Sequence, residues 1–238
     1  MEITGRDVTE LIPRRQGRVL LTFLVINRHH ESSRDELIGA IWGDDAPPDV
    51  DGALSTVLSR LRHVIGAEHL HGRGEVRLIL PGDAWIDFEA ADEAIHRAES
   101  AIAQRQWTRA WGPSLVALFV ARRGLLRGED LPWMQPHRRR LDEIHCSALE
   151  CYTASALGIA GGELHVGERT ARELIQLAPY RESGYRLLME IHAVRGNIAE
   201  ALRVYEELRT LLREELGATP SPPVQSLHMQ LLKQAGTT

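Results

Sequence analysis

The chain has 238 residues, of which 43% are hydrophobic, 26% charged and 5% aromatic, and its formal net charge is −5. This composition is typical of a globular protein and excludes a disordered chain, and the length predicts one large domain or two of ordinary size. The longest apolar stretch, residues 19–26, is far shorter than the roughly 20 residues that a membrane helix needs. The N-terminal residues are charged from Glu2 onward and contain no apolar signal core. We therefore expect a cytoplasmic protein that does not contact a membrane.

The basic residues are almost all arginine, since Lys233 is the only lysine among 28 Lys and Arg residues. A Walker A loop requires a lysine next to its glycines, and no GxGxxG motif follows a predicted strand. None of the 11 histidines has the spacing of a zinc site. Cys146 and Cys151 lie about 140° apart around a predicted helix, so they are not expected to form a disulfide with each other. These absences exclude nucleotide-driven and lysine-covalent chemistry and argue against a metal site. No Ser-His-Asp or Cys-His set is recognisable, although the members of such a triad can lie far apart in sequence. We expect a protein that is not an enzyme and holds no cofactor or metal.

Up to about residue 85 the sequence mixes short strands with helices. Ser32 and Ser33 precede two acidic residues and predict a helix N-cap, and the proline pair at 47–48 predicts a break after that helix. The patterns predict a hairpin over residues 2–11, helices over 18–27, 36–42 and 50–65, and a second hairpin within 69–80. Three helices followed by a hairpin form the outline of a winged helix-turn-helix, whose last helix enters the major groove and whose hairpin is the wing.

Beyond residue 85 the pattern is helical throughout. Glycine and proline pairs predict turns at Gly112-Pro113, Gly161-Gly162, Ala178-Pro179 and Gly196-Asn197, and residues 219–223 predict another. The amphipathic stretches between these turns predict helices over residues 88–104, 107–121, 134–157, 163–177, 182–195, 198–216 and 224–234.

A repeat runs through these helices, because Gly162 and Gly196 are 34 residues apart, the period of tetratricopeptide repeats. The second unit matches the repeat best, at Tyr185, Leu188, Gly196, Ala201 and Tyr205. The unit before it is degenerate, since Gly167 stands where alanine is usual. Ordinary packed helix pairs account for the same pattern, and the repeat adds to them a concave face that a partner can occupy.

Several motifs resemble a known family. Residues 33–47 (SRDELIGAIWGDDAP) and the LSRLR sequence at residues 58–62 resemble the helix-turn-helix of SARP-type regulators of actinobacteria, and SRLR is also found in OmpR-type winged helices. Residues 177–182 (LAPYRE), 195–202 (RGNIAEAL) and 211–217 (LLREELG) resemble the bacterial transcriptional activator domain of the same regulators.

The resemblance implies a mainly α protein with an N-terminal winged helix-turn-helix with small β-hairpins over residues 1–85, and an α-helical tetratricopeptide-like activator domain over residues 86–238. It implies a transcriptional activator that binds double-stranded promoter DNA and contacts RNA polymerase or a second protomer through its helical domain. The residues expected to contact DNA lie on the third helix and on the wing, and they are Ser55, Thr56, Ser59, Arg60, Arg62, His63, Arg73 and Arg77.

The charge distribution supports a second hypothesis. Residues 1–90 contain 10 arginines and 15 acidic residues, so the whole net charge of −5 lies in the half that is expected to bind DNA. DNA-binding domains usually carry a basic surface, because the release of counterions from DNA drives affinity. Asp44, Asp45, Asp49 and Asp51 precede or begin the third helix, and Arg60 has an alternative role as the ion-pair partner of an acid such as Glu36. The alternative function is therefore a protein-interaction scaffold whose winged helix no longer binds DNA.

Overall fold

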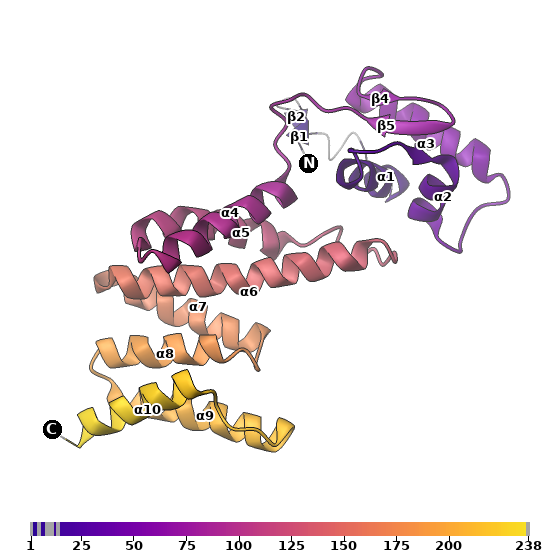
Figure 1. Ribbon diagram of the computed structural model, residues 1–238. Helices are drawn as coiled ribbons and strands as arrows, with labels where there is room; N and C mark the ends of the chain where they lie inside the picture. The colour runs from indigo at the N-terminus through magenta and orange to yellow at the C-terminus, as the bar shows by residue number, and fades with distance from the viewer. Residues whose placement is uncertain (1, 4–5, 8–11, 13–14, 237–238) are drawn as a thin grey trace. The chain divides into compact units, whose positions relative to one another are not determined.

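The structure is a computed structural model that describes residues 2–3, 6–7, 12 and 15–236 (Figure 1). The chain divides into two compact units, which we describe separately. The winged-helix unit consists of Met1–Trp85 and Leu126–Pro136, and the helical unit consists of Ile86–Leu125 and His137–Thr238. Within the described part of the chain, no helix has the length and apolar character needed to span a bilayer.

In its described residues the winged-helix unit contains three helices and two small sheets. The mainly α fold class with small N-terminal β-hairpins, predicted for the chain as a whole, is confirmed. A first hairpin pairs β1 (Glu2–Ile3) with β2 (Arg6–Asp7), and its turn and the predicted continuation over residues 8–11 lie outside the described residues. The elements that follow are α1 (Arg15–Ile26), β3 (Ser32–Ser33), α2 (Arg34–Trp42), α3 (Val50–Ile65), β4 (Leu70–His71) and β5 (Glu75–Leu78).

One strand, β3, is absent from the sequence prediction. The antiparallel sheet has the order β3-β5-β4, with Ser32 opposite Val76 and Leu70 opposite Leu78. Two serines have no hydrophobic alternation that identifies a strand. They pair with β5 because the chain must pass beside the wing to begin α2, and this pairing satisfies their backbone groups.

Local sequence explains where α2 and α3 begin. The Ser33 hydroxyl accepts from Glu36 N while the Glu36 carboxylate accepts from Ser33 N, which is a complete capping box. Asp49 caps α3 by accepting from Gly52 N at 3.0 Å. A Cβ on Gly52 would lie 2.2 Å from the Asp49 carboxylate, so a larger residue at position 52 requires this carboxylate to shift.

A segment remote in sequence completes the winged-helix unit. The Trp133 ring packs edge-on against Phe23 with 5.2 Å between ring centroids, and its Nε1 donates to Ala40 O at 3.0 Å. Arg15 Nε, at the start of α1, donates to Glu129 at 2.6 Å. Residues 126–136 therefore belong to the packing of α1 and α2 although they follow α5 in the chain.

The helical unit is built entirely of helices in its described residues. Figure 1 shows α7 to α10 packed each against the next. The helices are α4 (Asp87–Ala103), α5 (Trp107–Arg123), α6 (Met134–Ile159), α7 (Leu164–Leu177), α8 (Glu182–Val194), α9 (Ile198–Leu216) and α10 (Pro222–Ala235), with a 3-10 turn at Gly161–Glu163 before α7. The starts of α7 and α9 are 34 residues apart, which agrees with the predicted tetratricopeptide period. α7 contributes to both hydrophobic clusters of the helical unit. Leu174 packs in the cluster formed with α4, α5 and α6, and Ala171 packs in the cluster formed with α8, α9 and α10.

The predicted turn at Gly112-Pro113 is wrong, because α5 continues through both residues to Arg123. Proline removes one helical hydrogen bond, the one that would have reached the carbonyl of Arg109. The next carbonyl, that of Ala110, additionally accepts from the Ser114 hydroxyl at 2.7 Å. Ser114 is fully buried against the core, and burial of this face holds α5 together across the proline.

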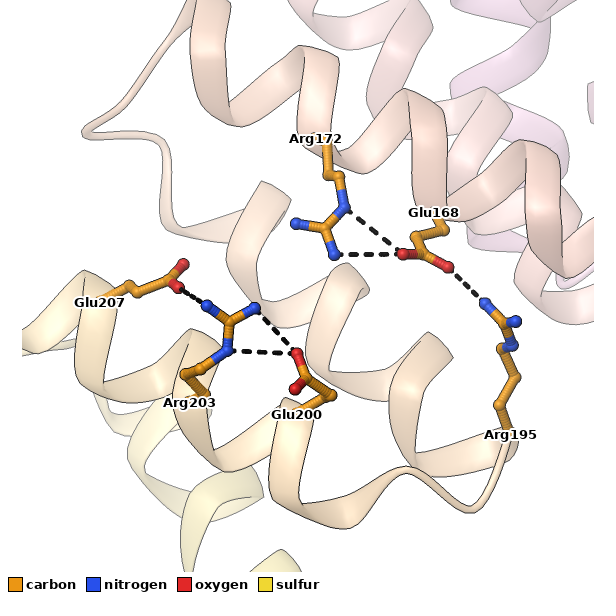
Figure 2. Close-up of polar contacts among 6 residues, drawn as sticks. All are labelled: Glu168, Arg172, Arg195, Glu200, Arg203 and Glu207. Carbon is orange, nitrogen blue, oxygen red and sulfur yellow. Dashed lines mark hydrogen bonds and ion pairs between the residues drawn. The ribbon is translucent and has the colours of Figure 1, made fainter.

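Two groups of ion pairs lie on the repeat helices, one joining α7 to the end of α8 and one within α9 (Figure 2). Glu168 on α7 accepts from Arg172 on the same helix and from Arg195 at the end of α8. Burial alone would raise the pKa of Glu168, but the Arg172 hydrogen bond and the charges of His192, Arg172 and Arg195 together lower it. On α9, Arg203 forms ion pairs with Glu200 and Glu207.

Beside this network lies a buried histidine, His192 of α8, and among the described residues neither of its ring nitrogens has a hydrogen-bond partner. Burial lowers its pKa, an effect reinforced by Arg172 and Arg195 and opposed by Glu168 and Glu200. Burial also lowers the pKa of three other histidines of this unit, His137, His145 and His228.

These histidines predict that acid destabilises the helical unit. The unfolded chain takes up protons with the ordinary histidine pKa of about 6.5, whereas the folded unit takes them up only at lower pH, so stability is lost as pH falls through 6.5. Urea unfolding of the chain, followed by circular dichroism between about pH 8 and pH 5.5, measures this slope. His192→Leu is expected to make the slope shallower, and an unchanged slope in this variant would contradict the assignment to His192.

Candidate nucleic-acid interface

Helix α3 has one buried and one exposed face. Leu54, Leu58, Leu61 and Ile65 are buried in the core of the winged-helix unit. The opposite face is exposed along its length and carries five of the eight predicted contact residues, Ser55, Thr56, Ser59, Arg60 and His63. The structure therefore brings these five side chains together on one solvent-facing surface, which we call the α3 face.

Arg60 is the basic residue of this face with the fewest constraints. Its side chain is exposed, and it forms no hydrogen bond or ion pair with any residue in the described part of the chain. The alternative partner considered from the sequence, Glu36, uses its carboxylate in the α2 capping box instead. A guanidinium without a protein partner keeps its full set of donors for a phosphate or a guanine edge.

Arg62 lies on a different side of α3, about 160° from Arg60 in helical angle. Its Nε donates to Leu70 O at 3.1 Å and its Nη2 donates to Gly72 O at 2.5 Å. Both acceptors belong to the wing hairpin, so Arg62 holds the wing against α3.

The remaining two predicted contact residues, Arg73 and Arg77, lie on the wing hairpin. Gly72 has φ +85°, and a Cβ there would lie 1.8 Å from Glu75 O, so the turn requires glycine. Arg73 follows at the tip, and Arg77 stands opposite His71 in the hairpin register. Both arginine side chains are exposed, whereas the alternating residues of β5 are buried.

Arg34, at the start of α2, connects the elements that form this surface. It is not among the eight residues that the sequence predicted to contact DNA. Its guanidinium donates to Asp51, to the Ser55 hydroxyl at 3.2 Å and to Arg73 O at 3.4 Å, so one residue connects α2, α3 and the wing. The sequence contained one signal of this role. A cation is unfavourable at the positive end of a helix, so an arginine in the first position of α2 indicates a partner elsewhere.

The acidic residues around α3 are partly neutralised. The carboxylate of Asp49 caps the helix, and that of Asp51 lies 3.0 Å from Arg34 Nη2. Asp44 and Asp45, in the loop before α3, have exposed side chains. Asp51 is therefore paired with a cation beside the α3 face, and this pair is already included in the net charge of residues 1–90.

The structure contains no constellation that points to metal or thiol chemistry in its described part. No group of three or more His, Cys, Asp or Glu side chains gathers there as a metal site. Cys146 and Cys151 are both free, as predicted, and burial raises the pKa of Cys151 to about 12. A thiol with such a pKa stays protonated at neutral pH and is inert as a nucleophile.

The predicted family membership can be compared with known proteins. The sequence profile of the family described as "Bacterial transcriptional activator domain" matches residues 86–232. The chain belongs to this family. The activator domain begins one residue before α4 and ends within α10, so it covers nearly the whole helical unit as well as residues 126–136.

Relatives of this activator-domain protein extend the similarity into the winged-helix unit. The regulatory protein AfsR of Streptomyces griseus is 32% identical over 225 residues, which cover 92% of this chain and 22% of AfsR. The transcriptional regulatory protein EmbR of Mycobacterium tuberculosis (strain H37Rv) is 27% identical over 255 residues, which cover 98% of this chain and 61% of EmbR. The chain thus spans between about a fifth and three fifths of the length of these relatives.

A solved structure shares the fold. Mycobacterium tuberculosis EmbR, determined in complex with a low-affinity phosphopeptide, matches with a TM-score of 0.72 and 24% sequence identity. The match covers 93% of this chain and 60% of that one. The fold of this chain is therefore already known from this relative.

Proposed function

We propose that this chain is a transcriptional activator that binds double-stranded promoter DNA through α3 and the wing of its winged-helix unit. The observation that carries the proposal is the α3 face, on which Arg60 is exposed and has no partner among the residues that the structure describes, beside a wing fixed by Arg62 and Arg34. The names of the relatives, which are regulatory proteins, support the same function. We further propose that the protein acts in the bacterial cytoplasm and is not an enzyme.

We propose different roles for the eight predicted residues. Arg60, Ser59 and His63 of the exposed α3 face are proposed to contact the major groove, and Arg73 and Arg77 of the wing to contact phosphates or the minor groove. Thr56 Oγ1 donates to Gly52 O at 2.9 Å and Ser55 accepts from Arg34, so both hydroxyls have protein partners before DNA binds. Arg62 acts indirectly, by holding the wing.

The proposal is tested by fluorescence anisotropy of the chain with pooled fragments of bacterial genomic DNA at low salt. We expect binding that survives competition by unlabelled random-sequence DNA for a subset of fragments. Binding that random DNA abolishes for every fragment contradicts sequence-specific recognition. The complete absence of binding at low salt favours the scaffold hypothesis, which the net charge of −5 in residues 1–90 supports.

Removing acidic charge beside the α3 face is expected to strengthen DNA binding. In the double variant Asp49→Asn, Asp51→Asn, asparagine still caps α3, while Arg34 is no longer neutralised by a carboxylate. We expect affinity to rise on the order of threefold at low salt and the gain to shrink as salt screens the charges. The matched control is the double variant Glu206→Gln, Glu214→Gln, which removes two exposed carboxylates from α9 and for which no change is expected. Equal effects in both variants would show that only overall charge matters.

The helical unit is proposed to contact RNA polymerase or a second protomer. Its helix pairs repeat with the 34-residue period, and stacked repeats of this kind leave a concave face lined by alternate helices. Analytical ultracentrifugation with and without DNA, together with retention of purified polymerase on the immobilised chain, tests this proposal. A strict monomer that retains no polymerase subunit overturns it.

A further inference from the structure

Helix α5 carries an apolar row on its exposed side. The row consists of Gly112, Leu115, Val116, Phe119 and Arg123, which follow one another at i, i+3, i+4, i+7 and i+11 and are all exposed. We call this row the α5 stripe. Such spacing places the five residues along one face of a helix, and it is the spacing by which one helix packs against another.

The α5 stripe is not needed for the core of the helical unit. The opposite side of α5 already supplies Ala110, Ser114, Ala117, Leu118 and Ala121 to the interior. Phe119 is 61% exposed, whereas the chain's other two phenylalanines, Phe23 and Phe88, pack against hydrophobic clusters. Leu115 and Val116 are 39% and 41% exposed, so three adjacent large apolar side chains face solvent together.

The charged residues of α5 itself are all basic. α5 contains no acidic residue and ends in Arg122 and Arg123. Arg122 is bound to Glu173 through two hydrogen bonds, but the Arg123 guanidinium lies over the Phe119 ring, 4.5 Å from its centroid. This position presents a cation at the end of the apolar row.

Of the five acidic residues of the neighbouring helix α4, at least two are paired with arginines. Asp92 accepts from Arg140 on α6, and Glu93 lies 3.9 Å from Arg97 on α4 itself. At the other end of the stripe, a Cβ placed on Gly112 would have no atom within 4 Å. The glycine therefore leaves room for the close approach of another backbone.

From these observations we infer that the α5 stripe is a docking site for an amphipathic helix of a partner protein that carries acidic residues beside its apolar face. The apolar side chains of such a helix cover Leu115, Val116 and Phe119, and its carboxylates face Arg123. Charge complementarity selects this occupant, since a basic or neutral helix leaves the Arg123 cation without a counter-charge. The inference rests on the part of the proposed function that gives the helical unit a protein partner. Its test contains no DNA, so its failure leaves the DNA-binding proposal standing.

Two model peptides of 18 residues provide the test. Both carry leucine at i, i+3, i+4 and i+7 positions, and the remaining positions are glutamate in the first peptide and lysine in the second. We expect the fluorescein-labelled glutamate peptide to bind the full chain at least about tenfold more tightly than the lysine peptide in anisotropy titrations. Phe119→Ser is expected to weaken binding of the glutamate peptide by about tenfold or more, and Arg123→Glu to shift the preference toward the lysine peptide.

The matched control is Met229→Ser, which removes an apolar side chain of similar exposure, 55%, from α10. It is expected to leave peptide binding unchanged, and circular dichroism verifies that each variant is folded. Equal binding of the two peptides, or equal losses in Phe119→Ser and Met229→Ser, overturns the inference. A dimer of the chain that Phe119→Ser dissociates also overturns it, because the stripe is then covered by a second copy.

Discussion

Arg60→Ala is expected to cost roughly 1–3 kcal/mol of DNA-binding free energy, if the guanidinium reads a guanine edge, and to relax specificity at one base pair. Arg60 is exposed on the α3 face and has no partner among the described residues, so its removal takes away a DNA contact without breaking a contact within the protein. Anisotropy titrations of the variant against a selected fragment and its single-base variants measure both effects.

A phosphate contact by Arg60 produces a different signature. Affinity then falls by a similar factor for every sequence, and the slope of log K against log salt decreases by about one. Arg18→Ala is the matched control, since Arg18 is an exposed arginine of the same unit that lies on α1 rather than on α3 or the wing. If Arg60→Ala leaves both the fold and the DNA affinity unchanged, the activator proposal is contradicted and the scaffold hypothesis is favoured.

Trp133→Ala is expected to destabilise the winged-helix unit by about 2–3 kcal/mol, somewhat less than the full cost of truncating a buried aromatic residue because Trp133 is half-buried. The substitution removes the ring that packs on Phe23 and leaves Ala40 O without its indole donor. Urea unfolding followed by circular dichroism, with limited proteolysis to locate the loosened unit, measures the effect.

Two further substitutions separate the parts of this contact. Trp133→Phe keeps an aromatic ring but loses the indole hydrogen bond and part of the packed ring area, so a loss of about 1 kcal/mol or slightly more is expected. Trp85→Ala removes a tryptophan of the same unit that is 69% exposed, and a change within about 0.5 kcal/mol is expected. Equal losses in Trp133→Ala and Trp85→Ala would show that residues 126–136 do not stabilise the winged-helix unit.

Periodicity and capping predicted most of the elements because these signals are local. The bounds of α3 and α9 agree with the prediction, and the remaining helices differ by a few residues at their ends. In α3 the apolar spacing of Leu54, Leu58 and Leu61 determines which side is buried, so the same spacing determines which residues form the α3 face. The family followed from longer motifs in the C-terminal half, and the activator-domain match confirms it.

Tertiary contacts decided the rest. Arg62 and Arg60 both belong to the Ser-Arg-Leu-Arg sequence, yet Arg62 binds carbonyls of the wing and Arg60 faces solvent. Helical angle indicates that they point to different sides, but only the position of the hairpin shows which side the wing occupies. The contacts of Arg34 were likewise not predictable from the sequence, because its acceptors on α3 and the wing lie 17 to 39 residues away.

The sequence by itself therefore determined the helices, their buried sides, the repeat period and the family, since each depends on the order of neighbouring residues. Only the tertiary structure decided that Ser32–Ser33 is a strand, that α5 runs through Pro113 and that Trp133 completes the winged-helix unit. In each case the stabilising partner is a backbone group or a buried face distant in sequence. The free energy of such contacts overrides a local propensity that favours a turn or a loop.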